Sequence, residues 1–136
     1  GAGAAVNFLA AIAPGGDRRV ALAASFAALH ARGHRLITRL WEGLGAIPGV
    51  TVYGPPPSAP RTPTVAFTVA GRTSKEVAVA LARRAVFVSN GDFYATTAVR
   101  RLGQSEHGVV RAGCACYTTA DEVERLIAGV GDSARK

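Results

Sequence analysis

Arg111 is the residue whose type and setting in this sequence most clearly suggest chemistry. It stands in the middle of an apolar run, VVRAG over residues 109–113, shortly before a helix start at Thr119 and Glu122. A guanidinium inside an apolar strand is costly unless an anion or several hydrogen bonds satisfy it. Its planar shape matches a carboxylate through two parallel hydrogen bonds, which makes Arg111 a candidate carboxylate-binding residue. The alternative is a structural arginine whose head reaches solvent or pairs with an acidic neighbour such as Glu122.

Two cysteines, Cys114 and Cys116, follow the arginine. Their side chains would project to the same face if the strand continued past residue 113. No lysine, arginine or histidine adjoins them closely in sequence to activate a thiolate. We therefore expect small buried cysteines near a strand end, with a catalytic nucleophile as the alternative.

His30 and His34 lie four residues apart on a predicted helix, which is metal-ligand spacing, and the two cysteines could complete a set of four ligands. Structural zinc sites use a turn such as C-x-x-C, however, and not a C-x-C within a strand. We therefore predict no metal site. His107 is expected to be a solvated loop residue.

The pattern of caps and apolar positions predicts the elements that would position Arg111. Asp17 is a candidate N-cap, and T-x-x-E capping boxes begin at Thr73 and Thr119. The predicted helices cover residues 1–12, 18–46, 73–84 and 95–102 and the segment after 119, and the predicted strands cover residues 50–53, 63–70, 86–88 and 108–115. Residues 54–60, rich in proline, should form a stiff extended loop.

Hydrophobic periodicity indicates which faces these elements bury. Helical spacing predicts one apolar stripe along the long helix, formed by Phe26, Leu29, Gly33, Ile37, Leu40, Trp41 and Leu44. Strand alternation places Val65, Phe67 and Val69 on one face. The sequence thus predicts the α+β (α/β) class: a single domain over 1–136, with a helical segment (1–48) leading into a small, mostly antiparallel sheet packed against helices (49–136).

Composition favours a compact globular chain. Hydrophobic residues make up 49% and charged residues 18% of 136 residues, enough for one core. The longest apolar runs fall short of the ~20 residues that a membrane helix needs, and two cysteines make no disulfide framework, so a cytoplasmic setting is expected. The net charge of +7 comes from scattered arginines with few aromatics between them, which argues against nucleic-acid binding.

Three segments, in this order, resemble one known family. They are residues 61–69 (RTPTVAFTV), 86–95 (VFVSNGDFYA) and 111–123 (RAGCACYTTADEV). Together they are similar to the C-terminal (small) domain of class V aminotransferases, most closely the cysteine desulfurase-like branch, which are fold-type I enzymes. The likeness extends upstream through residues 47–50 and the long helix. It implies pyridoxal phosphate held as a Schiff base to a lysine, an amino-acid substrate whose α-carboxylate binds Arg111, a substrate-binding segment that includes Asn90 and Tyr94, and a homodimer.

The lysine that the resemblance requires has no obvious counterpart here. The chain has only Lys75, in the first turn of a predicted surface helix, and Lys136 at its end. Neither stands in a strand-to-loop setting that could bury a Schiff base, and no glycine-rich phosphate loop is present. We therefore expect that this chain does not bind the cofactor covalently. The expected arrangement is a C-terminal piece of a longer enzyme, whose N-terminal large domain carries cofactor and lysine.

The second segment also departs from the desulfurase pattern. Desulfurases of the closest type carry a Gly-His-His-Cys-like turn, whereas this chain has Asp92, Phe93 and Tyr94, with Tyr94 in the register of the cysteine. Sulfur transfer needs a thiolate, which tyrosine cannot supply. Tyr94 either lines a substrate pocket or covers the sheet edge, and Asn90 and Gly91 are expected to form a tight turn. The reaction type (desulfurase, lyase or transaminase) stays open, and the alternative is a non-catalytic α/β module that binds a partner or small anion.

Overall fold

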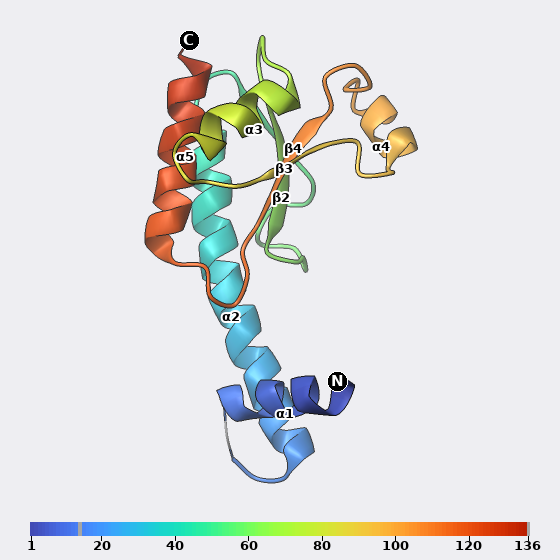
Figure 1. Ribbon diagram of the computed structural model, residues 1–136, viewed down its shortest axis with the longest axis vertical. Helices are drawn as coiled ribbons and strands as arrows, with labels where there is room; N and C mark the ends of the chain where they lie inside the picture. Colours follow the sequence, from blue (N-terminus) through green and yellow to red (C-terminus); the bar gives the residue numbers. More distant parts are fainter. Residues whose placement is uncertain (14, 136) are drawn as a thin grey trace.

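Five helices and one four-stranded sheet make up residues 1–13 and 15–135, which the computed structural model describes (Figure 1). The elements in chain order are α1 (Ala2–Ile12), α2 (Arg18–Gly45), β1 (Val50–Tyr53), β2 (Thr64–Val69), α3 (Ser74–Ala82), β3 (Ser89–Gly91), α4 (Thr96–Arg101), β4 (Val109–Gly113) and α5 (Ala120–Ala134). The predicted α+β class is therefore confirmed. None of the helices in the described part combines the length and apolarity needed to span a membrane.

The sheet has the order β1-β2-β4-β3, and every neighbouring pair is antiparallel. Phe67 pairs with Val110, whereas Arg111 pairs with Ala66 on one side and Ser89 on the other. Directly paired residues share a face of the sheet. The register therefore separates a core face from a second face that carries Arg111.

The core face is covered by helices, and α4 lies on the opposite side of the sheet (Figure 1). The side chains that fill this core are almost completely buried; they include Val65, Phe67, Val69 and Val110 from the sheet, Ile37, Leu40 and Leu44 from α2, Val77 and Leu81 from α3, and Val123, Leu126 and Val130 from α5. The alternation predicted for residues 63–70 is confirmed, with Val65, Phe67 and Val69 all buried.

The N-terminal half of α2 differs from the prediction. Helical spacing predicts an apolar stripe that includes Phe26, but this side chain is 56% exposed. The reason is that this half of α2 extends away from the sheet and is crossed by α1 (Figure 1). A hydrogen bond from the backbone N–H of Ala13 to the buried Ser25 Oγ (3.0 Å) joins the end of α1 to α2.

Local signals set the helix starts as the sequence predicts. The Asp17 side chain accepts a hydrogen bond from the Val20 N–H (2.9 Å). Both capping boxes are formed: Thr73 with Glu76 at α3, and Thr119 with Glu122 at α5. Hydrogen bonds from the threonine backbone and side chain hold the pKa of Glu76 and of Glu122 below the ordinary value.

The predicted strand over residues 86–88 is wrong, because β3 begins three residues later. Val86 is buried but lies outside the sheet, and Phe87 is 82% exposed. The pairing with β4 is made by Ser89, Asn90 and Gly91, so the expected tight turn at residues 90–91 is also wrong. An edge strand is held mainly by its backbone ladder, so these polar residues can form it without apolar side chains.

Candidate functional site

Arg111 lies on the face of the sheet that α2, α3 and α5 leave uncovered. It is the middle residue of β4 and is exposed, whereas Val110 and Ala112 on either side are buried on the core face. Its cross-strand neighbours are small, Ala66 on β2 and Ser89 on β3. The long side chain of Arg111 therefore stands on an open sheet surface with little bulk beside it.

One aromatic ring packs on this arginine. The guanidinium carbon of Arg111 lies 4.2 Å from the centroid of the Phe93 ring, a cation–π distance. Among residues 1–13 and 15–135, Arg111 makes no side-chain hydrogen bond or ion pair. The carboxylate of Glu122, the acidic neighbour considered from the sequence, instead accepts hydrogen bonds from the N–H and hydroxyl of Thr119. Arg111 is exposed, so its in-plane N–H donors reach solvent, as the structural alternative expects, and a ligand can approach them there.

Phe93 reaches Arg111 through an unusual turn after β3. Phe93 and Tyr94 both have positive φ, +56° and +58°, a backbone conformation that residues with bulky side chains rarely adopt. Asp92 holds the turn, because its side chain accepts a hydrogen bond from the Tyr94 N–H (3.1 Å) and its carbonyl accepts one from the Ala95 N–H (2.8 Å). Backbone strain of this kind persists where the surroundings impose it.

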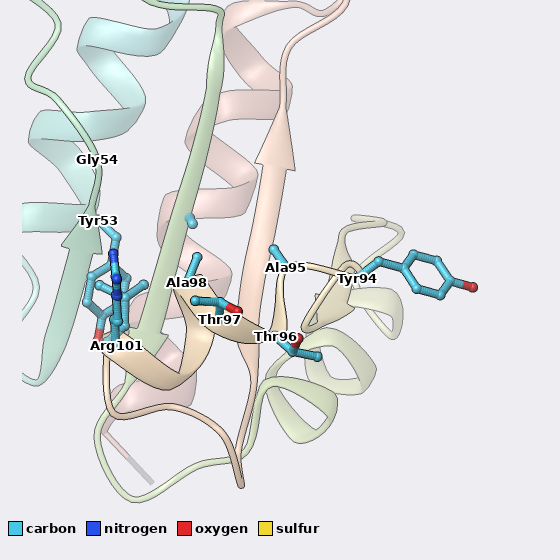
Figure 2. Close-up of a pocket in the computed structure, with 10 residues that line it drawn as sticks. Tyr53, Gly54, Tyr94, Ala95, Thr96, Thr97, Ala98 and Arg101 are labelled. Carbon is cyan, nitrogen blue, oxygen red and sulfur yellow. The ribbon is translucent and has the colours of Figure 1, made fainter.

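The side chains of Tyr94 and Asn90, the two other residues expected at the site, do not contact Arg111. Tyr94 is fully exposed and is one of the residues that line the groove described next, although its ring points away from the neighbouring side chains of α4 (Figure 2). Asn90 pairs with Val110, so its side chain belongs to the opposite face of the sheet from Arg111. The structure therefore brings Phe93, which the sequence reasoning missed, onto Arg111, and it does not bring the side chain of Asn90 there.

A groove of about 750 Å³ adjoins this site. It lies between the end of β1 and α4, and Figure 2 shows Tyr53 and Arg101 at one end of it. Ala66, the cross-strand partner of Arg111, forms part of its wall. The Tyr53 hydroxyl is 3.2 Å from Thr68 Oγ1, which fixes that ring against β2. An open groove next to an unpaired guanidinium can accept a small anionic molecule or a neighbouring protein surface.

Comparison with known proteins agrees with this architecture. A family model for aminotransferase class-V matches residues 7–126. The chain belongs to the class-V aminotransferases. The resemblance stated from the three sequence segments is therefore confirmed.

Individual relatives of this class-V chain are longer proteins. An aminotransferase-like protein, FGM3, of Gibberella zeae is 40% identical over 97 residues, covering 68% of this chain and 24% of that protein. A probable cysteine desulfurase 2 of Mycobacterium leprae is 35% identical over 103 residues, covering 76% of this chain and 24% of that protein. The apo structure of a cysteine desulfurase from Thermococcus onnurineus NA1 superposes with a TM-score of 0.77 at 26% identity, covering 87% of this chain and 29% of that chain. The chain thus spans about a quarter of the length of these relatives.

The two cysteines of this class-V chain lie apart from Arg111. β4 ends at Gly113, and Cys114 packs half-buried against the core, where burial raises the pKa of its thiol. Cys116 is exposed, which corrects the expectation that both are buried. Arg32 of α2 holds the segment between them and α5, since its guanidinium donates to the carbonyls of Cys116 (3.1 Å) and Thr118 (2.6 Å). The raised pKa of the half-buried Cys114 thiol makes it a poor nucleophile.

The histidines do not gather into a ligand set. The rings of His30 and His34 stack with centroids 6.4 Å apart, and both residues are exposed. Within the residues that the structure describes, no group of three or more His, Cys, Asp and Glu side chains is placed to hold a metal ion. His107 is exposed in the loop between α4 and β4, and its carbonyl accepts the Ser74 N–H (2.9 Å).

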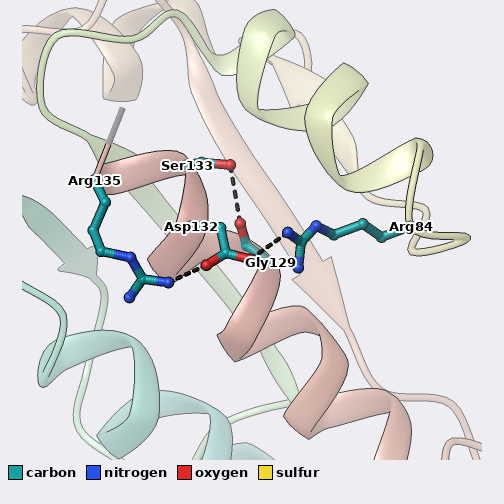
Figure 3. Close-up of polar contacts among 5 residues, drawn as sticks. All are labelled: Arg84, Gly129, Asp132, Ser133 and Arg135. Atoms are coloured by element: carbon teal, nitrogen blue, oxygen red, sulfur yellow. Dashed lines mark hydrogen bonds and ion pairs between the residues drawn. The ribbon is translucent and has the colours of Figure 1, made fainter.

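The charged cluster at the end of α5 has a structural role. Asp132 forms ion pairs with Arg84, just after α3, and with Arg135 (Figure 3). Although partial desolvation opposes it, these two guanidinium groups hold the pKa of Asp132 below its ordinary value. Ser133 donates to the carbonyl of Gly129 (3.0 Å) within the helix. The charges of Asp132, Arg84 and Arg135 are thus paired with one another, and the cluster ties α5 to the end of α3.

Proposed function

We propose that this chain is the C-terminal (small) domain of a longer pyridoxal-phosphate-dependent enzyme of the cysteine desulfurase-like branch, and that Arg111 binds the α-carboxylate of its amino-acid substrate. The observation that carries the proposal is the placement of Arg111 on the open face of the sheet with its in-plane donors unpaired by the described residues. Family membership and the quarter-length match to the relatives support the rest.

The residues of this chain do not fit the cofactor itself. Lys75 is exposed in the first turn of α3, and Lys136 lies outside the described residues. Gly15 and Gly16 join two helices, so they do not lead from a strand into a helix as a phosphate loop does. The proposal therefore assigns the cofactor, its Schiff-base lysine and most of a homodimer interface to a preceding large domain.

What this chain supplies is orientation of the substrate. A guanidinium that donates two parallel hydrogen bonds fixes both the position and the plane of a carboxylate, which a single point charge does not. When a second domain covers the open face and the groove, exclusion of water strengthens that interaction.

Tyr94 bears on the reaction type. It stands in the register where desulfurases of the closest type carry the sulfur-accepting cysteine, and a phenol cannot form a persulfide. Its fully exposed ring is available to line a substrate pocket completed by the large domain. Asn90, on the other face, is not proposed to touch the same carboxylate. We therefore expect the longer enzyme to release sulfur from cysteine poorly.

The test uses Arg111→Ala and Arg111→Lys in the full-length protein, with Arg83→Ala as control, because Arg83 is exposed at the end of α3 on the other side of the sheet. Binding of L-alanine should weaken by about 2–5 kcal/mol for the alanine variant. The lysine variant should retain part of the affinity, because it keeps the charge but loses the two-pronged geometry. Thermal stability should change little. A lowered melting temperature with unchanged affinity would show that Arg111 is structural and would refute the proposal.

A further inference from the structure

The side chain of Arg111 needs something to hold it. Arginine has many rotamers, and its fixation costs conformational entropy. The neighbours on its face, Ala66 and Ser89, are too short to confine it, and no hydrogen bond or ion pair within residues 1–13 and 15–135 does so. The contact that the structure provides is the ring of Phe93, 4.2 Å from the guanidinium carbon.

We propose that Phe93 is a positioning residue, whose ring fixes the plane of the Arg111 guanidinium so that its edge faces the substrate carboxylate; this rests on the function proposed above. Stacking and carboxylate binding use different parts of the group. The ring covers a flat face of the guanidinium, whereas the N–H donors lie in its plane. Phe93 can therefore restrict Arg111 without competing with the carboxylate for its hydrogen bonds.

The backbone supports this role. Phe93 has a φ of +56°, which an aromatic residue adopts only at a cost in free energy, and glycine would adopt it freely. If the ring had no task, glycine would give the same turn with less strain. The hydrogen bonds that Asp92 accepts from Tyr94 and Ala95 hold the turn in place. The strained turn therefore places the Phe93 ring against the guanidinium, and such strain is found at binding sites where the surroundings impose it.

The experiment measures carboxylate discrimination in the full-length protein with its cofactor. Calorimetry gives the dissociation constants of L-alanine and of L-alaninamide, which lacks the carboxylate, and their ratio is the discrimination. The variants are Phe93→Leu, which keeps an apolar side chain, Phe93→Gly, which keeps the turn and relieves its strain, and Phe93→Tyr, which keeps the ring. Phe87→Leu is the matched control, because Phe87 is 82% exposed and precedes β3.

We expect Phe93→Leu and Phe93→Gly to lower the discrimination roughly three- to tenfold, the size of a partly exposed cation–π contact. Phe93→Tyr should retain it, and Phe87→Leu should leave it unchanged. Phe93→Gly should melt no lower than the unmodified protein, so a loss of discrimination there cannot come from unfolding.

The outcomes separate the two proposals. If discrimination survives Arg111→Ala, the proposed function is wrong and this inference falls with it. If discrimination depends on Arg111 but is unchanged in both Phe93→Leu and Phe93→Gly, Arg111 binds the carboxylate without help and the positioning role is overturned. If Phe93→Gly lowers the melting temperature and leaves discrimination intact, the ring is structural and the inference is likewise overturned.

Discussion

Replacing Gly108 with alanine should weaken the attachment of β3 to β4 and destabilise the fold by about 2–5 kcal/mol. Gly108 has a φ of +64°, where alanine costs about 1–2 kcal/mol. A Cβ there would also lie 3.0 Å from Gly91 Cα, 3.1 Å from Gly91 O and 2.8 Å from Ser74 Oγ. Backbone atoms cannot rotate away as side chains do, so β3 has to shift, and such overpacking costs about 1–3 kcal/mol.

Gly103→Ala is the matched control. Gly103 lies in the same connection between α4 and β4 with a φ of +71°, but a Cβ there would meet no atom within 4 Å. It should therefore lose only the conformational part, about 1–2 kcal/mol. Urea unfolding can be followed by the fluorescence of Trp41, the only tryptophan in the chain, which packs under the Arg61 guanidinium. Equal losses in the two variants would refute the close contact between Gly108 and Gly91.

Three further predictions concern other parts of the chain. The isolated chain should not form a covalent adduct with pyridoxal phosphate, because Lys75 is exposed at the start of α3; borohydride trapping at Lys75, detected by mass spectrometry, would contradict this. Replacing Cys114 and Cys116 together with alanine should leave the activity of the full-length protein largely intact, and a loss without unfolding would make one of them a nucleophile. The carboxyl pKa values of Glu76 and Glu122 lie below 4.5, so their stabilising effect is complete above about that pH and is lost as the pH falls through the lowered values. Changing both to glutamine should flatten the acid side of a plot of unfolding free energy against pH, and an unchanged slope would show that other groups dominate it.

The sequence predicted best where the signal is local. The capping boxes of Thr73 with Glu76 and Thr119 with Glu122 are complete within four residues, so no tertiary information is needed to place the helix starts. The strand that contains Phe67 follows from alternation in the same way. A capping box satisfies backbone hydrogen bonds within its own segment, and strand alternation shows which face of that segment is buried.

The sequence-based predictions were wrong where the structure of a segment depends on contacts with residues far away in the chain. The apolar residues 86–88 suggested a strand, but Val86 is used to fill the core and the polar residues 89–91 make the backbone ladder. Phe26 continues the periodic stripe of α2, yet it is exposed, because periodicity shows that a helix face is apolar and says nothing about what covers it. In both cases the apolar pattern is real, but the pattern alone does not show which residues contact these side chains.

The position of β3 also decides which residue reaches Arg111. Because the strand ends at Gly91, Phe93 is only two residues beyond it, and the turn at Asp92 can fold its ring back over the adjacent strand. If the strand ended at residue 88, five loop residues would separate it from Tyr94. Neither aromatic ring would then be held close to the sheet. The same turn directs the two rings apart, Phe93 onto the guanidinium and Tyr94 into solvent. The register of one short edge strand, which the sequence pattern does not encode, thus determines that the ring beside Arg111 belongs to Phe93 and not to Tyr94.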